Sequence, residues 1–295
     1  MTAADAGRGE RARRFAARAG AIGCALVLAV IVASAYLRIS QAGLGWSGLA
    51  GVARVVHRLA ASAEALLAVM IVVVCWGARR RWTGGALTAA VIAVLTVFLT
   101  LLGIVTAEAQ TPAVTLGNLL GGMALLGTLW SLRLQARGAV APDSSAAAFW
   151  MWSGVALLAL QIALGGLVSA HGAAKSCGTL PGCDGEWWPE DGSRALHMAH
   201  RFSAAIVLLY WAAFALRLRL RERAAARGAT AVTAMLAAQA ALGAIVVASG
   251  AAVAVAVMHN AWAALTVVVA VSAIFYSKPP GAAEPPAARQ IATSK

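Results

Sequence analysis

Long apolar stretches limit what this chain can fold into. Eight of them, each about 20 residues long, contain few charges, and 61% of all 295 residues are hydrophobic. They cover roughly residues 19–37, 54–76, 85–105, 112–132, 148–170, 195–216, 229–249 and 251–276. About 20 apolar residues cross the hydrocarbon core of a bilayer as an α-helix. Since the alternating pattern of a membrane β-barrel is absent, the stretches predict an all-α membrane protein with eight transmembrane helices.

The basic residues predict how these helices are oriented. The formal net charge is +13, and 18 of the 24 Lys and Arg residues fall on one side of the predicted bundle. This bias marks the cytoplasmic side of a plasma (inner) membrane, with both termini inside. We therefore interpret the basic clusters as topology signals rather than as nucleic-acid sites. The N-terminal run also resembles a signal peptide, but it is long enough to span and no clear cleavage site follows, so we expect a transmembrane helix.

The sequence repeats itself. A His-Arg pair opens the second stretch at His57 and the sixth stretch at His200, 143 residues later. Two further matches link the third stretch to the seventh and the fourth to the eighth, at nearly the same offset. The repeat predicts two similar four-helix bundles, residues 1–137 and 138–295.

Two histidines at similar depth mark a candidate site in the second half. His200 and His259 lie in different predicted helices, and an ionisable residue inside a membrane is costly enough to indicate function. They are either core histidines bonded to carbonyl groups or the ligands of a metal, for which haem iron is the best candidate. Small residues beside both leave room for a flat macrocycle, which favours haem. The first half offers only His57, because Gly117 occupies the position that matches His259.

Three more side chains lie close to these histidines in sequence. Arg58 and Arg201 each follow a histidine directly. Each arginine either extends to the lipid head groups or pairs with a haem propionate, and the recurrence in both halves favours the propionate. His197 is one helical turn before His200 and shares its face, where it acts as a proton relay, a propionate partner or an interfacial histidine.

The long loop after the fifth stretch contains Cys177 and Cys183. In an oxidising outer compartment this pair forms a disulfide, and a zinc site with the nearby His171 is the alternative. The same loop carries Trp187 and Trp188, which predict either a cap over the bundle or an anchor at the membrane interface.

These pieces together resemble the haem A synthases, membrane proteins that supply haem A for cytochrome oxidase assembly. The resemblance rests on QIALGGLV at 161–168, CGTLPGCDGEWWP at 177–189, His197-Met198-Ala199-His200-Arg201, and His259-Asn260. It covers most of the chain and is stronger in the second half.

The resemblance implies an oxidoreductase that converts a ring methyl of haem O into a formyl through successive hydroxylations. It implies a haem b held by His200 and His259, a haem O site at His57 in the first half, and a disulfide between Cys177 and Cys183. The implied partners are a haem O donor enzyme, the oxidase assembly machinery and membrane lipid, and a homo-oligomer is compatible with it.

The first half departs from the family pattern. Arg54 stands where members carry a glutamate, Gly117 stands where they carry a histidine, and the first outer loop has no cysteine pair. One interpretation is a five-coordinate haem with an open face, as oxygen chemistry requires. The other is a non-catalytic haem-binding assembly factor. A two-haem, b-type electron carrier needs histidine pairs in both halves, so Gly117 argues against it. We expect the enzymatic function to be retained.

Overall fold

Eight long helices make up nearly all of the computed structural model, which describes residues 3–40, 48–105, 111–140, 146–219 and 223–275. They are α1 (Ala3–Ile39), α2 (Gly48–Gly77), α3 (Thr83–Val105), α4 (Pro112–Ala136), α5 (Ala146–Ala170), α6 (Gly192–Arg219), α7 (Arg223–Ala248) and α8 (Val253–Phe275). Each of the eight is long and apolar enough to cross a membrane. The predicted all-α, eight-span membrane fold is therefore confirmed.

Several helices start at residues that the hydropathy of the sequence does not predict. Helix α1 starts at Ala3, well before the apolar stretch, because its basic N-terminal segment continues the helix. Helix α6 starts after Asp191, whose Oδ1 accepts a hydrogen bond from the Arg194 backbone N–H at 2.9 Å, as an N-cap does. Helix α8 starts later than predicted, because Gly250 and Ala251 form a turn with φ values of 64° and 60°.

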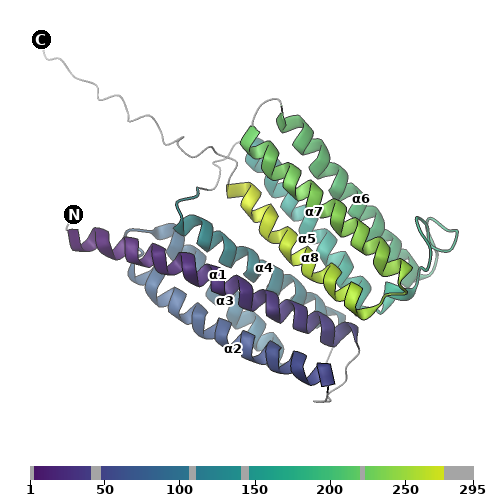
Figure 1. Cartoon of the computed structure of the whole chain (residues 1–295), viewed down its shortest axis with the longest axis horizontal. Coiled ribbons are helices and arrows are strands. Elements are labelled where there is room, and N and C mark those ends of the chain that lie inside the picture. The colour runs from purple at the N-terminus through teal and green to yellow at the C-terminus, as the bar shows by residue number, and fades with distance from the viewer. Residues whose placement is uncertain (1–2, 41–47, 106–110, 141–145, 220–222, 276–295) are drawn as a thin grey trace, which may run out of the picture.

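The helices pack as two groups of four. Helices α1 to α4 contact one another in a ring, and α5 to α8 lie beside them, with α1 and α4 touching α8 and α4 touching α5 (Figure 1). The start of α1 and the end of α8 lie at one end of the molecule, here called the terminal end, and the α5–α6 loop lies at the other, the loop end. The boundary between two domains at residues 137 and 138 stays a prediction.

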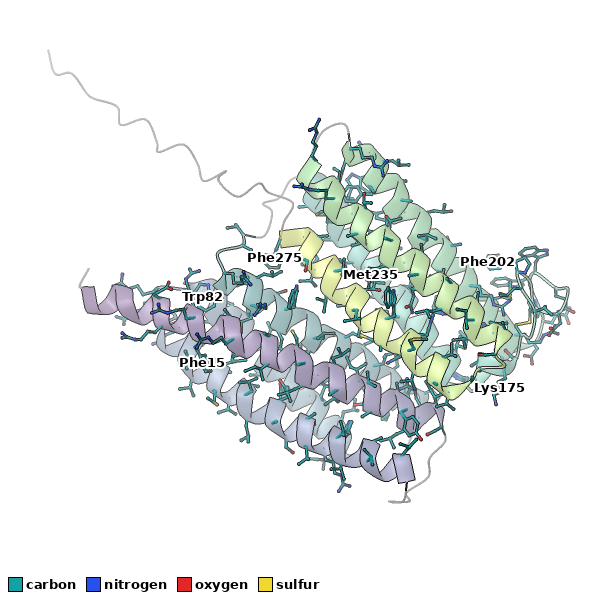
Figure 2. The ribbon with its side chains drawn as sticks, in the orientation of Figure 1. Phe15, Trp82, Lys175, Phe202, Met235 and Phe275 are labelled. Atoms are coloured by element: carbon teal, nitrogen blue, oxygen red, sulfur yellow. A yellow bond between two sulfur atoms is a disulfide. The ribbon has the colours of Figure 1, made fainter. Side chains whose placement is uncertain are left out.

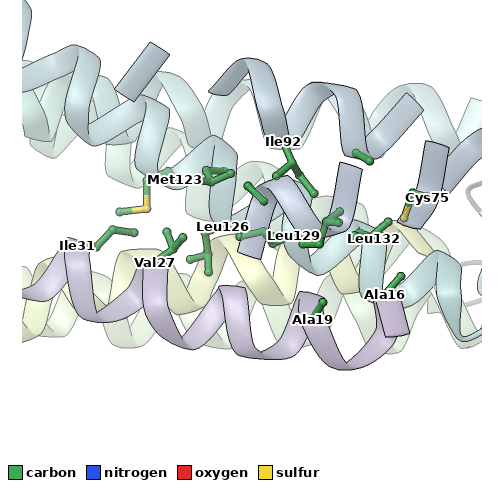
Figure 3. Close-up of a cluster of buried hydrophobic side chains, with 14 of the residues drawn as sticks. Ala16, Ala19, Val27, Ile31, Cys75, Ile92, Met123, Leu126, Leu129 and Leu132 are labelled. Atoms are coloured by element: carbon green, nitrogen blue, oxygen red, sulfur yellow. The ribbon is translucent and has the colours of Figure 1, made fainter. Parts of the chain in front are cut away.

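The first bundle has an aliphatic interior. Buried Ile92, Leu126 and Leu129 meet between α1, α3 and α4 (Figure 3). At Gly23 of α1 a Cβ atom would lie 2.9 Å from a Leu129 methyl group, and at Gly20 it would lie 2.8 Å from the Leu129 carbonyl oxygen. Small residues thus bring the α1 and α4 backbones close together, as is common in membranes, where packing rather than water exclusion drives helix association.

The second bundle is filled along only part of its length. Fully buried Trp211 lies in an apolar cluster that extends to Phe275 at the terminal end, and its Nε1 donates to the Gly154 carbonyl oxygen at 3.3 Å. Along α6, α7 and α8 the residues closer to the loop end surround a cavity instead. Lys175 and Phe202 lie at the loop end, and Phe275 lies at the terminal end (Figure 2).

Candidate functional site

A cavity of about 860 Å³ occupies the loop end of the second bundle. Residues of α5, α6, α7 and α8 form most of its wall, and Met123 of α4 and Arg38 of α1 complete it from the first bundle. Cavities that bind small molecules and cofactors have volumes of about 300–1,000 Å³ and mostly apolar walls with a few polar groups. Four of the residues that the sequence singled out line this cavity: His197, His200, Arg201 and His259.

His200 of α6 is positioned by α5. The Gln161 amide nitrogen lies 3.1 Å from the His200 Nδ1 and donates to the His200 carbonyl oxygen at 3.2 Å. One turn further along α5, a Cβ atom at Gly165 would lie 2.9 Å from the His200 Cε1. The missing side chain at Gly165 therefore creates the space that this imidazole occupies.

His259 of α8 is positioned by α7 in the same way. The Gln239 amide nitrogen lies 3.1 Å from the His259 Nε2 and donates to the His259 carbonyl oxygen at 3.1 Å. A Cβ atom at Gly243 would lie 3.3 Å from the His259 Cε1. The two rings line one cavity.

Polar atoms without a protein partner gather around the cavity. Among the described residues, six buried side-chain nitrogen or oxygen atoms have no hydrogen-bond partner, and all six belong to residues that line it. They are Gln161 Oε1, His197 Nδ1, Arg201 Nε, Gln239 Oε1, His259 Nδ1 and Asn260 Nδ2. Each such atom costs about 1–3 kcal/mol when buried unpaired. Their concentration in one place is the pattern expected of a site built for a polar or metal-containing ligand.

The cavity is positively charged at its loop end. Arg38, Lys175 and Arg201 line it, and no Asp or Glu of the described part of the chain does so. The Arg38 Nε donates to the Ser169 Oγ at 3.0 Å, which ties α1 of the first bundle to α5 of the second. Lys175 is exposed to solvent, so it lies where the cavity opens. Arginine and lysine here favour a ligand with carboxylate groups.

Arg201 also holds the loop between α5 and α6. Its Nη1 donates to the carbonyl oxygens of Thr179 at 2.8 Å and Gly182 at 2.7 Å, and its Nη2 donates to that of Cys177 at 3.2 Å. Sequence reasoning gave Arg201 only a ligand or a lipid head group as a partner. The structure adds a third role, because its terminal nitrogens bind the loop while its buried Nε lines the cavity without a partner among the described residues.

The loop is closed by a disulfide between Cys177 and Cys183. Asp184 and Gly185, with φ values of 53° and 92°, form a tight turn that is flanked by paired backbone hydrogen bonds between Cys183 and Glu186. The disulfide uses both thiols, and the described residues contain no cluster of three or more metal-ligand side chains. The structure thus supports the disulfide and gives the alternative zinc site with His171 no ligand set.

Aromatic side chains of the loop lie beside the cavity. Trp187 lines it, and Trp187 and Trp188 both stack on Phe202 of α6, with ring centroids 6.4 and 6.1 Å away. The tryptophans are exposed by 59% and 67%. The loop therefore covers one side of the cavity while it presents aromatic surface outward; the role of these tryptophans as a membrane-interface anchor stays a prediction.

The first bundle keeps its candidate residues apart from this cavity. His57 on α2 is half-buried, Arg58 is exposed, and neither lines the cavity. At Gly117 of α4, the position that matches His259, a Cβ atom would lie 3.0 Å from a Leu102 methyl group and 3.7 Å from the Phe98 ring. Apolar side chains of α3 thus occupy the space beside Gly117, whereas the matching His259 lines a cavity.

The cavity residues fit a haem. Two imidazoles, one from each helical hairpin, would supply the nitrogen ligands that haem iron takes, and three cations would match two propionate groups. The glycines beside both rings and the unpaired polar atoms are features of this chain that a filled apolar core would not require.

Comparison with known proteins assigns the chain to a family. A family model described as cytochrome oxidase assembly protein matches residues 52–271, which include the whole disulfide loop and both cavity histidines. A search of curated proteins finds no match to the chain. Because the family model covers most of the sequence, the chain belongs to the cytochrome oxidase assembly protein family, in agreement with the resemblance to haem A synthases.

Proposed function

We propose that this membrane protein is a haem A synthase that carries a resident haem b in the second bundle and oxidises haem O in the first. The observation that supports it best is the placement of His200 and His259 on one cavity, together with six unpaired buried polar atoms. Family membership supports the role in cytochrome oxidase assembly.

In this proposal the side chains around the cavity have separate tasks. His200 and His259 hold the haem iron, and Arg38, Lys175 and Arg201 bind the propionates. The aliphatic cluster around Trp211 closes the cavity toward the terminal end. The bound haem b supplies one-electron transfer, and the surrounding apolar wall excludes water from it.

His57 is the proposed site for haem O. By the repeat in the sequence, His57 of α2 is the counterpart of His200 of α6. A single imidazole would leave one face of this haem open, as its oxidation by oxygen chemistry requires. Arg58, one residue further, is proposed to bind a propionate of this substrate.

A second candidate function is a haem-binding assembly factor without catalysis. The specific observation that favours it is the apolar contact at Gly117, where Leu102 and Phe98 of α3 occupy the space facing α4. Arg54, in place of a carboxylate, lies on the same helix as His57 and favours it too.

Pigment analysis distinguishes the two functions. The full chain is expressed with a source of haem O, and the haems are extracted and separated by chromatography. The enzyme predicts haem A in the wild type and its loss in His57→Ala. Haem B alone in the wild type would contradict the enzyme and support the assembly factor.

The setting of the protein completes the proposal. The charge bias predicts that the terminal end faces the cytoplasm and that the loop end faces the oxidising side of the plasma membrane, as the disulfide requires. The proposed partners are an enzyme that supplies haem O and the oxidase assembly machinery that receives haem A. Labelling of a Lys175→Cys variant with a thiol reagent from outside intact cells tests the orientation. Labelling only after lysis would contradict it.

A further inference from the structure

Each cavity histidine contacts a glutamine from the helix that precedes it. We propose that Gln161 and Gln239 are a matched pair of positioning residues, which orient His200 and His259 and set how strongly these rings donate electrons to iron. This inference rests on the proposed haem site.

The contacts are similar in both hairpins, although Gln161 lies against the Nδ1 of His200 and Gln239 against the Nε2 of His259. Gln161 reaches both the ring and the backbone carbonyl oxygen of His200, at 3.1 and 3.2 Å. Gln239 reaches both the ring and the carbonyl oxygen of His259, at 3.1 Å each. A carboxamide nitrogen carries two hydrogens, so one group makes both contacts and fixes the ring relative to its own helix.

A glycine one turn after each glutamine completes the arrangement. Gly165 and Gly243 each lie four residues after their glutamine, on the same face of α5 and α7. Added Cβ atoms would lie 2.9 and 3.3 Å from the Cε1 atoms of the two imidazoles. In both hairpins the glutamine holds one edge of the ring, and the glycine leaves room for the ring itself.

Each of the two glutamines also has an unpaired amide oxygen. Gln161 Oε1 and Gln239 Oε1 are buried, and neither has a partner among the described residues. In the first bundle, Leu99 stands at the position of α3 that matches Gln239, and Gly117 stands where His259 would be. At this pair of positions the second bundle has both the glutamine and the histidine, and the first bundle has neither.

The chemistry of a bound imidazole explains the free oxygen. When one ring nitrogen binds a metal, the other carries a proton, and it needs an acceptor. A half-turn of the carboxamide exchanges its nitrogen and oxygen, which are alike in size. Each glutamine can thus donate to its ring when no iron is bound and accept from the ring N–H when iron is bound. In the second arrangement it gives up its hydrogen bond to the histidine carbonyl oxygen. Such an acceptor orients the ring and raises its basicity.

Two replacements at each position test this role. Leucine keeps the size and removes hydrogen bonding, and glutamate keeps the shape and is a stronger acceptor. In the purified full chain, Gln161→Leu and Gln239→Leu should each weaken haem b binding about 10- to 100-fold and raise the haem midpoint potential. Gln161→Glu and Gln239→Glu should retain the haem and lower the potential, because a more basic ring stabilises ferric iron.

Gln135 of α4 provides the matched control. It is another half-buried helical glutamine, and its Nε2 donates to the Thr88 Oγ1 at 3.0 Å, remote from the cavity. Gln135→Leu should leave both the haem spectrum and the potential unchanged. Potentials that stay at the wild-type value in all four cavity variants would overturn the inference while the haem site stands. If the leucine variants fail to fold, unchanged potentials in the glutamate variants overturn it equally. A wild-type protein without low-spin haem would instead overturn the proposed function itself.

Discussion

His259 of α8 contacts Gln239 of α7 in the second bundle, whereas the matching positions of the first bundle hold Gly117 of α4 and Leu99 of α3. Both bundles have four helices in similar order, but one surrounds a cavity and the other has an aliphatic interior at its centre. The buried carboxyl of Glu64 in the first bundle has a hydroxyl partner, Thr96 Oγ1, at 3.4 Å. The comparison teaches that a few polar and glycine positions decide whether a membrane bundle fills its interior or keeps a cavity.

Removal of a cavity histidine should have the largest effect on this contrast. His200→Ala and His259→Ala should each abolish the low-spin, bis-imidazole spectrum of the purified protein, because the iron loses one of two axial ligands. His57→Ala is the matched control and should retain that spectrum. Low-spin haem in either cavity variant would contradict the ligand assignment.

Substitutions in the first bundle should also be able to create the second histidine ligand that it lacks. The double variant Gly117→His/Leu102→Ala tests this. A Leu102 methyl group lies 3.0 Å from a Cβ atom built at Gly117, so its removal makes room for the new imidazole. If His57 binds a haem, the double variant should show a second low-spin haem per chain, measured as haem content and by electron paramagnetic resonance. Gly117→His alone should give less of this second low-spin haem. An unchanged low-spin haem content in the double variant would mean that no haem binds at His57.

A methyl group added at a glycine should have a smaller effect, and it should reduce haem retention only in the second bundle. A Cβ atom at Gly165 would lie 2.9 Å from the His200 Cε1, whereas nothing lies within 4 Å of one at Gly103. Overpacking costs about 1–3 kcal/mol, so Gly165→Ala should weaken haem retention roughly tenfold. Gly103→Ala should leave it unchanged. Equal haem retention in the two variants would show that Gly165 does not shape the cavity.

The loop contacts should have the smallest effect. Lysine cannot reproduce the four carbonyl contacts that the Arg201 guanidinium makes, at Cys177, Thr179, Pro181 and Gly182. Arg201→Lys should therefore lower the thermal unfolding temperature and speed proteolysis of the loop, with an expected loss of about 1 kcal/mol in the free energy of unfolding. Arg58→Lys, on an exposed residue of the first bundle, is the control and should change neither measurement. Unchanged proteolysis in Arg201→Lys would argue against the loop contact.

The sequence predicts the membrane spans well, because apolar length alone requires them. Each of the eight predicted stretches corresponds to one helix of the structure. Helix ends are less predictable, since polar residues such as those before α1 continue a helix outside the apolar core, and the turn at Gly250 and Ala251 shortens α8. These ends depend on local backbone geometry rather than on hydropathy.

The site is only partly predictable from the sequence. The histidines were found because an ionisable group in an apolar helix is conspicuous. Arg38 was missed as a cavity residue because its contact with Ser169 spans 131 positions, and no local pattern encodes such a distance. Gln161 and Gln239 were missed although QIALG and QAALG repeat in α5 and α7. That repeat was the available signal, but the face it occupies is invisible in helices that are apolar all round.

The haem content and spin state of the purified wild-type chain test the central claim most directly. Optical and electron paramagnetic resonance spectra of the full chain in detergent should show one low-spin haem b per chain with two imidazole ligands. A colourless preparation, or haem that is entirely high-spin, would contradict a haem held by His200 and His259.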